Sequence, residues 1–291
     1  MDDLLRLLPP IRRTRGARLY ASDGRRFLDL WLDGGRGILG ERDRRARTMA
    51  ANAADKGLTR PYPGLYDERF AKSVSEAWPG FGSVKAFSSE ESALQAAARV
   101  LGPAFATVDS ARRPNPGSNP GSNPGSNPGS SAVRSAVLAI ARPFAAVCAE
   151  ADLAMPVLPC PRPYAPWCLM ARDGSAAAAA LAAEPGELVA AQSLFAASRG
   201  LWSLGQAVKD GYDERLWARF DKRLGAFFER SGPYAFARLD DERYPDFFRA
   251  ALCGGALVAP RPNAPSVVPP DFDDGELVAL ARALEKAFPR A

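Results

Sequence analysis

The stretch 84–101 constrains the fold of this chain most, because it joins an expected strand to an expected helix through a polar turn. Residues 84–87 (Val-Lys-Ala-Phe) are typical of a short strand, 88–91 (Ser-Ser-Glu-Glu) of a turn, and 92–101 of a helix. Such a unit belongs to α/β folds and can bind an anion, since the first N–H groups of a helix are unpaired and its dipole is positive there. Glu90 and Glu91 favour the alternative that carboxylates of the same turn satisfy those N–H groups.

The chain has 291 residues and no histidine, which narrows the chemistry it can perform. Without imidazole there is no Ser-His or Cys-His pair and no histidine ligand for zinc, so we expect no metal site. The cysteines form no CxxC pair and are typical of buried free thiols in a reducing cytosol; they are Cys148, Cys160, Cys168 and Cys253. The sequence therefore predicts a cytoplasmic protein.

Charge and hydropathy disfavour two classes of partner. Residues 1–10 lack the pattern of a signal peptide, and the longest apolar run, 176–183, is too short and too alanine-rich to span a bilayer. The formal net charge is +5, and arginines cluster at residues 12–18 and 42–47. Acidic residues lie among these arginines and no nucleic-acid-recognition fold is visible. We therefore interpret the clusters as part of a solvated surface, and we expect neither a membrane nor a nucleic-acid partner. The alternative, nucleic-acid binding, predicts an affinity that falls steeply with salt.

Four copies of Asn-Pro-Gly-Ser occupy residues 115–130. These residue types favour turns and offer no apolar face, so the sequence predicts a disordered linker over 113–131. A strand is expected on each side of it, at 104–108 and at 136–141, where a continuous apolar run is typical of a buried strand.

Periodicity predicts the other elements. A β-hairpin over residues 18–32 turns at Ser-Asp-Gly, residues 22–24. Helical spacing of apolar residues, with a strand at 256–260, predicts helices at 176–183, 193–204, 216–227, 247–252 and 277–288. The third of these helices is expected to close at Gly232 and Pro233, and the last to be capped by Asp273 or Asp274.

Several of these blocks share residues with a known enzyme family. The blocks are 16–20 (Gly-Ala-Arg-Leu-Tyr), 23–29 (Asp-Gly-Arg-Arg-Phe-Leu-Asp), Leu39-Gly40, Pro79-Gly80 and 87–91 (Phe-Ser-Ser-Glu-Glu). Together they resemble class III aminotransferases, which are pyridoxal-phosphate (PLP) enzymes of fold type I. The C-terminal order of a helix, Gly-Gly, Leu-Val-Ala-Pro, an Asp-rich cap and a final helix is similar to the glutamate-1-semialdehyde aminomutase subgroup.

The resemblance implies an α/β fold with two domains. A three-layer αβα large domain, shortened against the family, would bind the cofactor at residues 61–205. A smaller α+β domain would be built from both chain ends, residues 1–60 and 206–291. The resemblance also implies a homodimer, because the family's site lies between subunits.

The resemblance further assigns positions to the cofactor chemistry, and several of them lack the expected residue. Ser88 and Ser89 match the phosphate loop, in which serine and threonine hydroxyls hold the PLP phosphate. Leu158 falls where the family has its Schiff-base lysine, and no lysine lies between Lys85 and Lys209. Ala141-Arg142-Pro143 stands where an aspartate would pair with the pyridine nitrogen, and Val189 stands near a phosphate-contacting threonine.

These departures indicate a protein that has kept the scaffold without the chemistry. A leucine cannot form an aldimine, and a missing carboxylate removes support for the ring nitrogen. We therefore expect no catalytic residue, and a structural or partner-binding role, since a fold can outlive its site. The alternative is an active PLP-dependent aminotransferase or aminomutase that uses a remote amine, for which Lys85 and Lys209 are the candidates.

Overall fold

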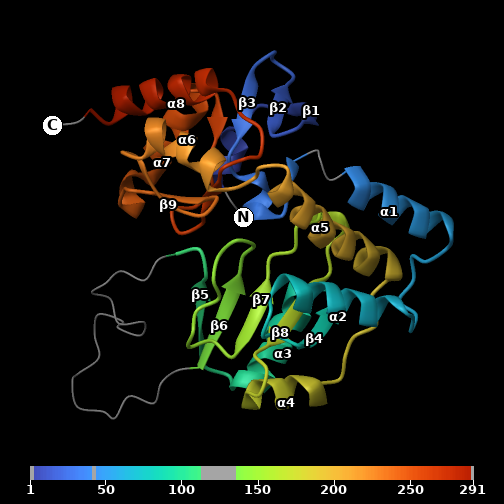
Figure 1. Ribbon diagram of the computed structural model, residues 1–291. Coiled ribbons are helices and arrows are strands. Elements are labelled where there is room, and N and C mark those ends of the chain that lie inside the picture. The colour runs from blue at the N-terminus through green and yellow to red at the C-terminus, as the bar shows by residue number, and fades with distance from the viewer. Residues whose placement is uncertain (1–2, 41–43, 113–135, 290–291) are drawn as a thin grey trace, which may run out of the picture. The chain divides into compact units, whose positions relative to one another are not determined.

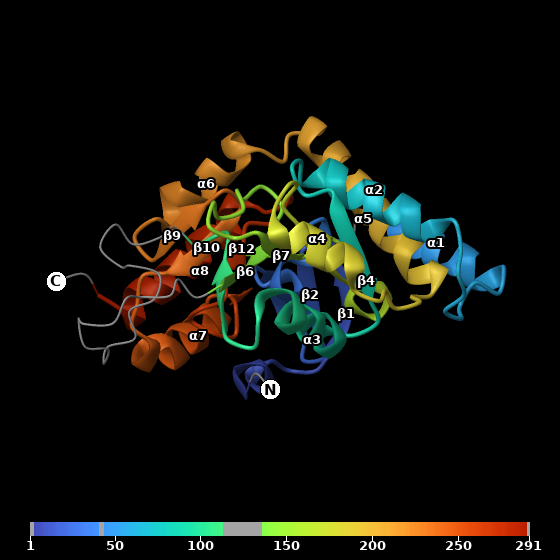
Figure 2. The same ribbon diagram turned by 90° about the horizontal axis from the view of Figure 1, so that it is seen from below.

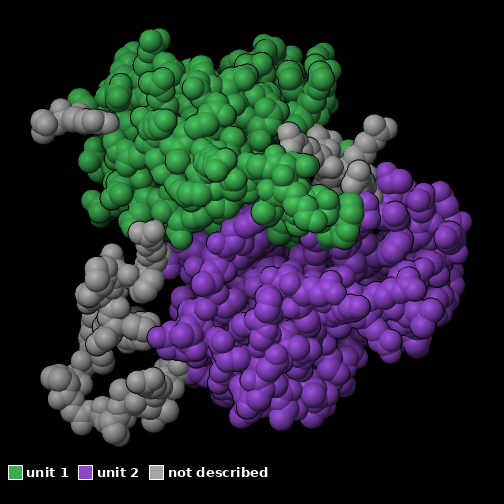
Figure 3. Space-filling model, in the orientation of Figure 1, with its two compact units in different colours: residues 1–47, 159–162, 202–291 green, residues 48–158, 163–201 purple. Residues whose placement is uncertain are grey.

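The computed structural model describes residues 3–40, 44–112 and 136–289 (Figure 1). Contacts divide the chain into two compact units, shown in green and purple in Figure 3. Unit 1 comprises residues 1–47, 159–162 and 202–291, and unit 2 comprises residues 48–158 and 163–201. The predicted domain boundaries at residues 60 and 205 stay predictions, and the predicted linker 113–131 lies outside the described residues.

Unit 2 is built on one five-stranded sheet. Its strands, in spatial order, are β4 (Ser83–Phe87), β8 (Trp167–Ala171), β7 (Leu153–Pro156), β6 (Ala136–Ala141) and β5 (Phe105–Asp109). β5, β6 and β7 pair in parallel, whereas β8 is antiparallel to both β7 and β4. β4 therefore runs in the same direction as β5, β6 and β7, and the carboxyl ends of these four strands lie at one edge of the sheet.

Helices cover both faces of this sheet. α2 (Tyr66–Ala77) and α3 (Glu90–Leu101) lie on opposite sides of it, as Figures 1 and 2 show together, and α4 (Ala176–Ala183) packs against α3. Phe87, Leu138 and Leu153 from the strands form a buried core with alanines of α3 and Leu181 of α4. Small residues on α3 let the helix lie close to the strands, and the result is the predicted three-layer arrangement.

Two further helices have residues in both units. α1 spans Arg44–Asp55 and α5 spans Ala191–Lys209. In unit 2, Tyr66 of α2 meets Phe195 of α5 edge to face with ring centroids 5.3 Å apart. None of the helices in the described residues is long and apolar enough to cross a membrane.

The described residues of unit 1 form two small sheets, packed with helices that lie wholly within this unit. One sheet has the order β1 (Ile11–Arg15), β2 (Arg18–Ala21), β3 (Arg26–Asp29) and β11 (Ala256–Leu257), and the other has the order β12 (Ser266–Val267), β10 (Tyr234–Ala237) and β9 (Phe228–Ser231). The helices are α6 (Glu214–Leu224), α7 (Tyr244–Cys253) and α8 (Asp274–Ala287). The predicted hairpin at residues 18–32 is confirmed as β2 and β3.

Buried aromatic rings and one arginine hold unit 1 together. Phe247 and Tyr234 are fully buried, and the Tyr244 hydroxyl donates to the Ala259 carbonyl at 2.6 Å. The Arg18 guanidinium binds both Glu276, at 2.9 Å, and Asp271, at 2.9 Å. The two ends of the chain are therefore joined by charge as well as by strand pairing.

Three predictions differ from the structure. The predicted helix 216–227 ends at Leu224, and Gly232 is the turn of the hairpin β9–β10 rather than a helix stop. β9 pairs with β10 across this turn, and Arg230 of β9 donates to Asp221 of α6 at 2.9 Å. The strand expected at 256–260 is shorter, and Cys253 is exposed instead of buried.

Candidate functional site

The candidate site lies at the edge of the unit 2 sheet where the parallel strands end. Ser88 follows β4, Asp109 ends β5, Arg142 follows β6, and Leu158 comes two residues after β7. Ligands of open α/β sheets bind outside the carboxyl ends of their strands, because loops and helix N-termini converge there. The structure thus brings Ser88, Arg142 and Leu158, which the sequence singled out, to one edge together with Asp109.

The turn between β4 and α3 holds a carboxylate from a distant segment. The backbone N–H of Ser88 donates to Glu187 Oε2 at 2.8 Å, and the Ser88 hydroxyl donates to the same oxygen at 2.7 Å. These two bonds, with a further one from the Ser92 hydroxyl, lower the pKa of Glu187. The carboxylate is therefore charged at neutral pH, and the donors that Ser88 offers an anion are already engaged.

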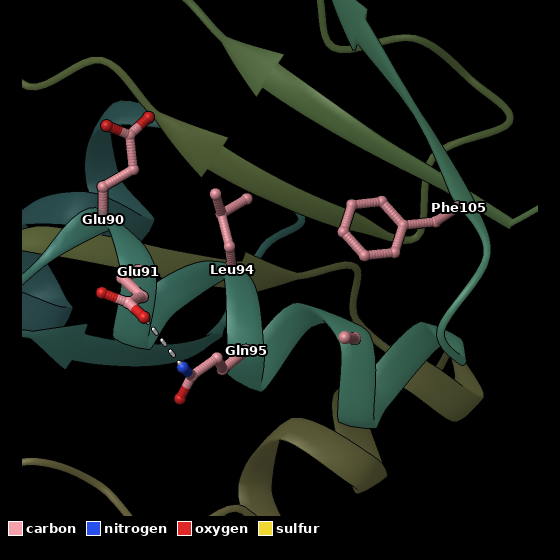
Figure 4. A pocket seen from close by; sticks show the side chains of 6 residues that line it. Glu90, Glu91, Leu94, Gln95 and Phe105 are labelled. Atoms are coloured by element: carbon pink, nitrogen blue, oxygen red, sulfur yellow. Dashed lines mark hydrogen bonds between the residues drawn. The ribbon is translucent and has the colours of Figure 1, made fainter.

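Ser89 begins α3 as its N-cap. Its hydroxyl oxygen accepts a hydrogen bond from the Ser92 N–H at 3.1 Å and lies 3.0 Å from the Ser92 hydroxyl. The carboxylates of Glu90 and Glu91 were the alternative acceptors for the N–H groups at the helix start, but the Ser92 N–H is satisfied by Ser89 instead. Glu91 accepts from its own helix, from Gln95 Nε2 at 3.4 Å (Figure 4).

A shallow groove of about 610 Å³ runs along the exposed face of α3. Leu94 of α3 and Phe105 of β5 form its apolar part, and Glu90 and Glu91 lie at the end nearest the turn (Figure 4). These two carboxylates add negative charge next to the helix N-terminus, which weakens its attraction for a second anion.

Arg142 and Asp109 form a largely buried ion pair at the ends of β6 and β5. Arg142 Nε donates to both carboxylate oxygens of Asp109 at 2.8 Å, and the two side chains are 9% and 18% exposed. The Ser110 hydroxyl accepts from the Arg142 N–H at 2.9 Å. Asp109 is thereby bound to a guanidinium of the chain itself, and a cation stands where the resemblance places a carboxylate.

Leu158 is part of the hydrophobic core. The Val157 N–H just before it donates to the Ala141 carbonyl at 2.8 Å and continues the pairing of β7 with β6, and Leu158 itself is 0% exposed. Val189, at the position expected to hold a threonine, is also buried, at 5% exposed.

The two candidate amines lie in different units. Lys85 lies on β4, paired with Leu169 of β8, and its Cδ comes within 3.8 Å of the position that a Cβ on Gly186 would take. Lys209 is the last residue of α5 and belongs to unit 1. Of the two candidate amines, Lys85 is therefore the one whose side chain lies beside the segment that carries Glu187.

Sequence reasoning missed two residues of this edge, Glu187 and Asp109. Glu187 is 99 positions from Ser88, and no local pattern joins them. Asp109 had a usable signal, since a carboxylate at the end of an expected strand lies at the ligand edge of a parallel sheet.

These contacts test the cofactor that the resemblance implies, and the residues present do not fit it. A PLP phosphate would need the Ser88 donors that Glu187 holds. Its aldehyde would need an amine where Leu158 is buried, and its ring nitrogen would need a carboxylate where Arg142 binds Asp109. The structure therefore supports no reaction step through PLP at this edge.

Known sequences give little functional information. A protein of Treponema pallidum (strain Nichols), described as uncharacterized, is 28% identical over 281 residues, covering 92% of this chain and 91% of that protein. An uncharacterized protein of Borreliella burgdorferi is 36% identical over 88 residues, 30% of this chain and 33% of that protein. No model of a known protein family matches the chain.

Solved structures show the fold. An omega-transaminase from Sphaerobacter thermophilus matches with a TM-score of 0.65 at 14% identity, over 96% of this chain and 91% of that one. A transaminase with PLP bound gives a TM-score of 0.64 at 15% identity, over 95% of this chain and 90% of that one. The ornithine delta-aminotransferase of Plasmodium falciparum gives a TM-score of 0.63 at 12% identity, over 97% of this chain and 94% of that one. The predicted fold is confirmed: this chain has the fold of PLP-dependent aminotransferases.

Proposed function

We propose that this chain is a non-catalytic protein of aminotransferase fold, kept for a structural or partner-binding role. The observation that carries the proposal is Leu158, which is buried at the carboxyl end of β7 where the family resemblance places the Schiff-base lysine. A hydrocarbon side chain has no nucleophile, so covalent catalysis through an aldimine has no starting group at this position.

Two further contacts support the proposal. Arg142 neutralises Asp109, so neither residue offers a free carboxylate to a ring nitrogen. Glu187 holds both donors of Ser88 and competes with any phosphate for them. Among the residues that the structure describes, those at this edge thus offer no amine at the Leu158 position, no unpaired carboxylate at the end of β6 and no open phosphate site at Ser88.

The test is to titrate purified protein with PLP and to record the near-visible absorption band of a lysine aldimine, followed by borohydride reduction and peptide mass mapping. We expect no band above that of a Lys85→Ala variant, and reduced adducts scattered at low level over exposed lysines such as Lys72. A stoichiometric adduct on a single lysine would end the proposal.

A second candidate function is an active PLP-dependent aminotransferase or aminomutase that uses a remote lysine. Lys85 favours it, because its side chain lies beside Gly186 and it lies on β4, three residues before Ser88. Lys85→Ala and Lys209→Ala should each be assayed for transamination with a panel of amino donors. Activity that is lost in one variant supports this function, whereas full activity in both removes the two lysines as candidates.

We also propose a protein partner, either a second copy of this chain or another protein. The support is indirect, since a scaffold without chemistry is maintained only through what it binds. Light scattering of the purified protein across a concentration series tests the homodimer, and a mass of one chain at every concentration would exclude it.

A further inference from the structure

We propose that Glu187 is a built-in ligand of the anion site at the β4–α3 turn and that it closes this site to phosphate-type anions. The inference rests on the proposed non-catalytic function and deepens it, because it names the group that replaced the cofactor phosphate. It concerns the described residues of unit 2 alone.

The geometry is that of a carboxylate held by the turn that leads into a helix. One oxygen, Glu187 Oε2, accepts both the N–H and the hydroxyl of Ser88, at 2.8 and 2.7 Å. These distances are in the range of charge-assisted hydrogen bonds. Ser88 lies immediately before the N-cap Ser89 of a 12-residue helix, so the carboxylate also lies near the positive end of the α3 dipole.

The segment that carries Glu187 is fixed on both sides. Glu184, three residues earlier, receives an ion pair from Arg99 of α3 at 2.8 Å. Val189, two residues later, is buried, and Gly186 lies against the Lys85 side chain. The backbone on both sides of Glu187 is therefore anchored, which keeps its side chain within reach of Ser88.

Tethering explains why a diffusible anion would lose the competition. A group held by a short segment acts at an effective concentration in the millimolar range or above. Inorganic phosphate must exceed that concentration to displace Glu187, and it must also approach the carboxylates of Glu90 and Glu91 in the first turn of α3. Removing the tethered carboxylate removes the competitor while leaving the Ser88 donors in place.

The experiment compares inorganic phosphate binding to the wild-type chain and to Glu187→Ala by calorimetry and by phosphate-dependent thermal stabilisation. We expect Glu187→Ala to bind phosphate at least about tenfold more tightly than the wild type. The double variant Glu187→Ala/Ser88→Pro, which removes both the N–H and the hydroxyl, should lose that gain.

Glu76→Ala is the matched control, because it removes one exposed carboxylate of unit 2 from a pair with Lys72 on α2. An equal gain in phosphate affinity in Glu76→Ala, or no gain in phosphate affinity in a folded Glu187→Ala, overturns the proposal. If Glu187→Ala fails to fold, Glu187→Gln keeps the side-chain volume and should show a smaller gain of the same sign; its absence also overturns the proposal. Neither PLP nor any lysine takes part, so this outcome is separate from that of the borohydride test.

Discussion

Leu158 shows how one residue can be read either as a site or as core. From the sequence, the family resemblance implied only that Leu158 occupies the position of the Schiff-base lysine. The structure shows that its side chain has no exposed surface. A fully buried leucine contributes through hydrophobic transfer and close packing, and its truncation leaves a cavity. The position therefore serves the stability of unit 2.

Leu158→Ala should lower the free energy of unfolding by about 2–5 kcal/mol. Leu188→Ala is the control, because Leu188 is 51% exposed and its truncation removes little buried area. Urea unfolding followed by circular dichroism measures both. Equal, small losses in the two variants would contradict the assignment of Leu158 to the core.

Asp29 carries a second prediction at the residue scale. Burial raises the pKa of Asp29 to about 6 from 3.8, although the N–H groups of Trp31 and Leu32 donate to its Oδ1 at 2.9 and 2.8 Å. An acid with a raised pKa in the folded state binds its proton more tightly there than in the unfolded chain. Its favourable contribution is thus complete below the unfolded pKa and is lost as pH rises through the folded pKa.

Asp29→Asn keeps an oxygen acceptor and removes the charge. We expect the variant to be as stable as the wild type near pH 3.5 and more stable above pH 6, by at most about 3 kcal/mol. The measurement is the difference in unfolding free energy between the two proteins at a series of pH values. A difference that does not change with pH would show that Asp29 does not titrate in this range.

At the scale of elements, α4 illustrates how a cap decides where a helix begins. Its sequence is almost entirely alanine, which favours helix but does not fix the first turn. Ser175 fixes it, because its hydroxyl oxygen accepts from the Ala178 N–H at 3.1 Å while the hydroxyl donates to the Arg172 carbonyl at 2.7 Å. The predicted helix at 176–183 is confirmed for this local reason.

Ser175→Ala should cost about 1 kcal/mol of unfolding free energy, because the Ala178 N–H loses its side-chain acceptor and keeps only the Ser175 carbonyl. Ser198→Ala is the comparison within a helix interior, where the hydroxyl donates back to the Leu194 carbonyl at 2.8 Å. Alanine is the better helix former there, so this change should be neutral or stabilising. Guanidinium unfolding of both variants checks the difference, and an equal loss would contradict the capping role.

At the scale of the whole molecule, the sheet of unit 2 determines how long the chain between β5 and β6 must be. The two strands are parallel, with Phe105 opposite Ala136 and Asp109 opposite Ile140. The chain between them must therefore return along a strand of about 16 Å before it can pair again.

Deleting two of the four Asn-Pro-Gly-Ser copies leaves enough chain to span up to about 50 Å, which exceeds that return path. We expect the shortened protein to fold and its unfolding free energy to rise by about 0.4 kcal/mol, because a shorter loop loses less entropy on closure. Thermal unfolding of the full-length and the shortened protein measures this difference in unfolding free energy. A large loss of stability would mean that the repeat makes contacts the fold needs.

Local pattern predicted a large part of the elements. The strand at 136–141, the hairpin at 18–32 and the helices α4, α7 and α8 follow from periodicity and caps, which act over a few residues. β9 and β10 were missed because the helical spacing through Phe227 was taken to run on to Gly232, whereas the two strands form a hairpin there and β10 also pairs with β12, far along the chain. Pairing across such distances leaves no local signature.

By itself, the sequence determined that Ser88 and Ser89 lie in a turn between a strand and a helix, that Leu158 cannot act as an amine, and that Arg142 cannot act as a carboxylate. Only the tertiary structure decided that Glu187 holds Ser88, across 99 positions, and that Asp109 binds Arg142, across 33. The physical reason is that side-chain chemistry is fixed by each residue alone. Which donors remain free depends on the segments that the fold brings to the same edge of the sheet.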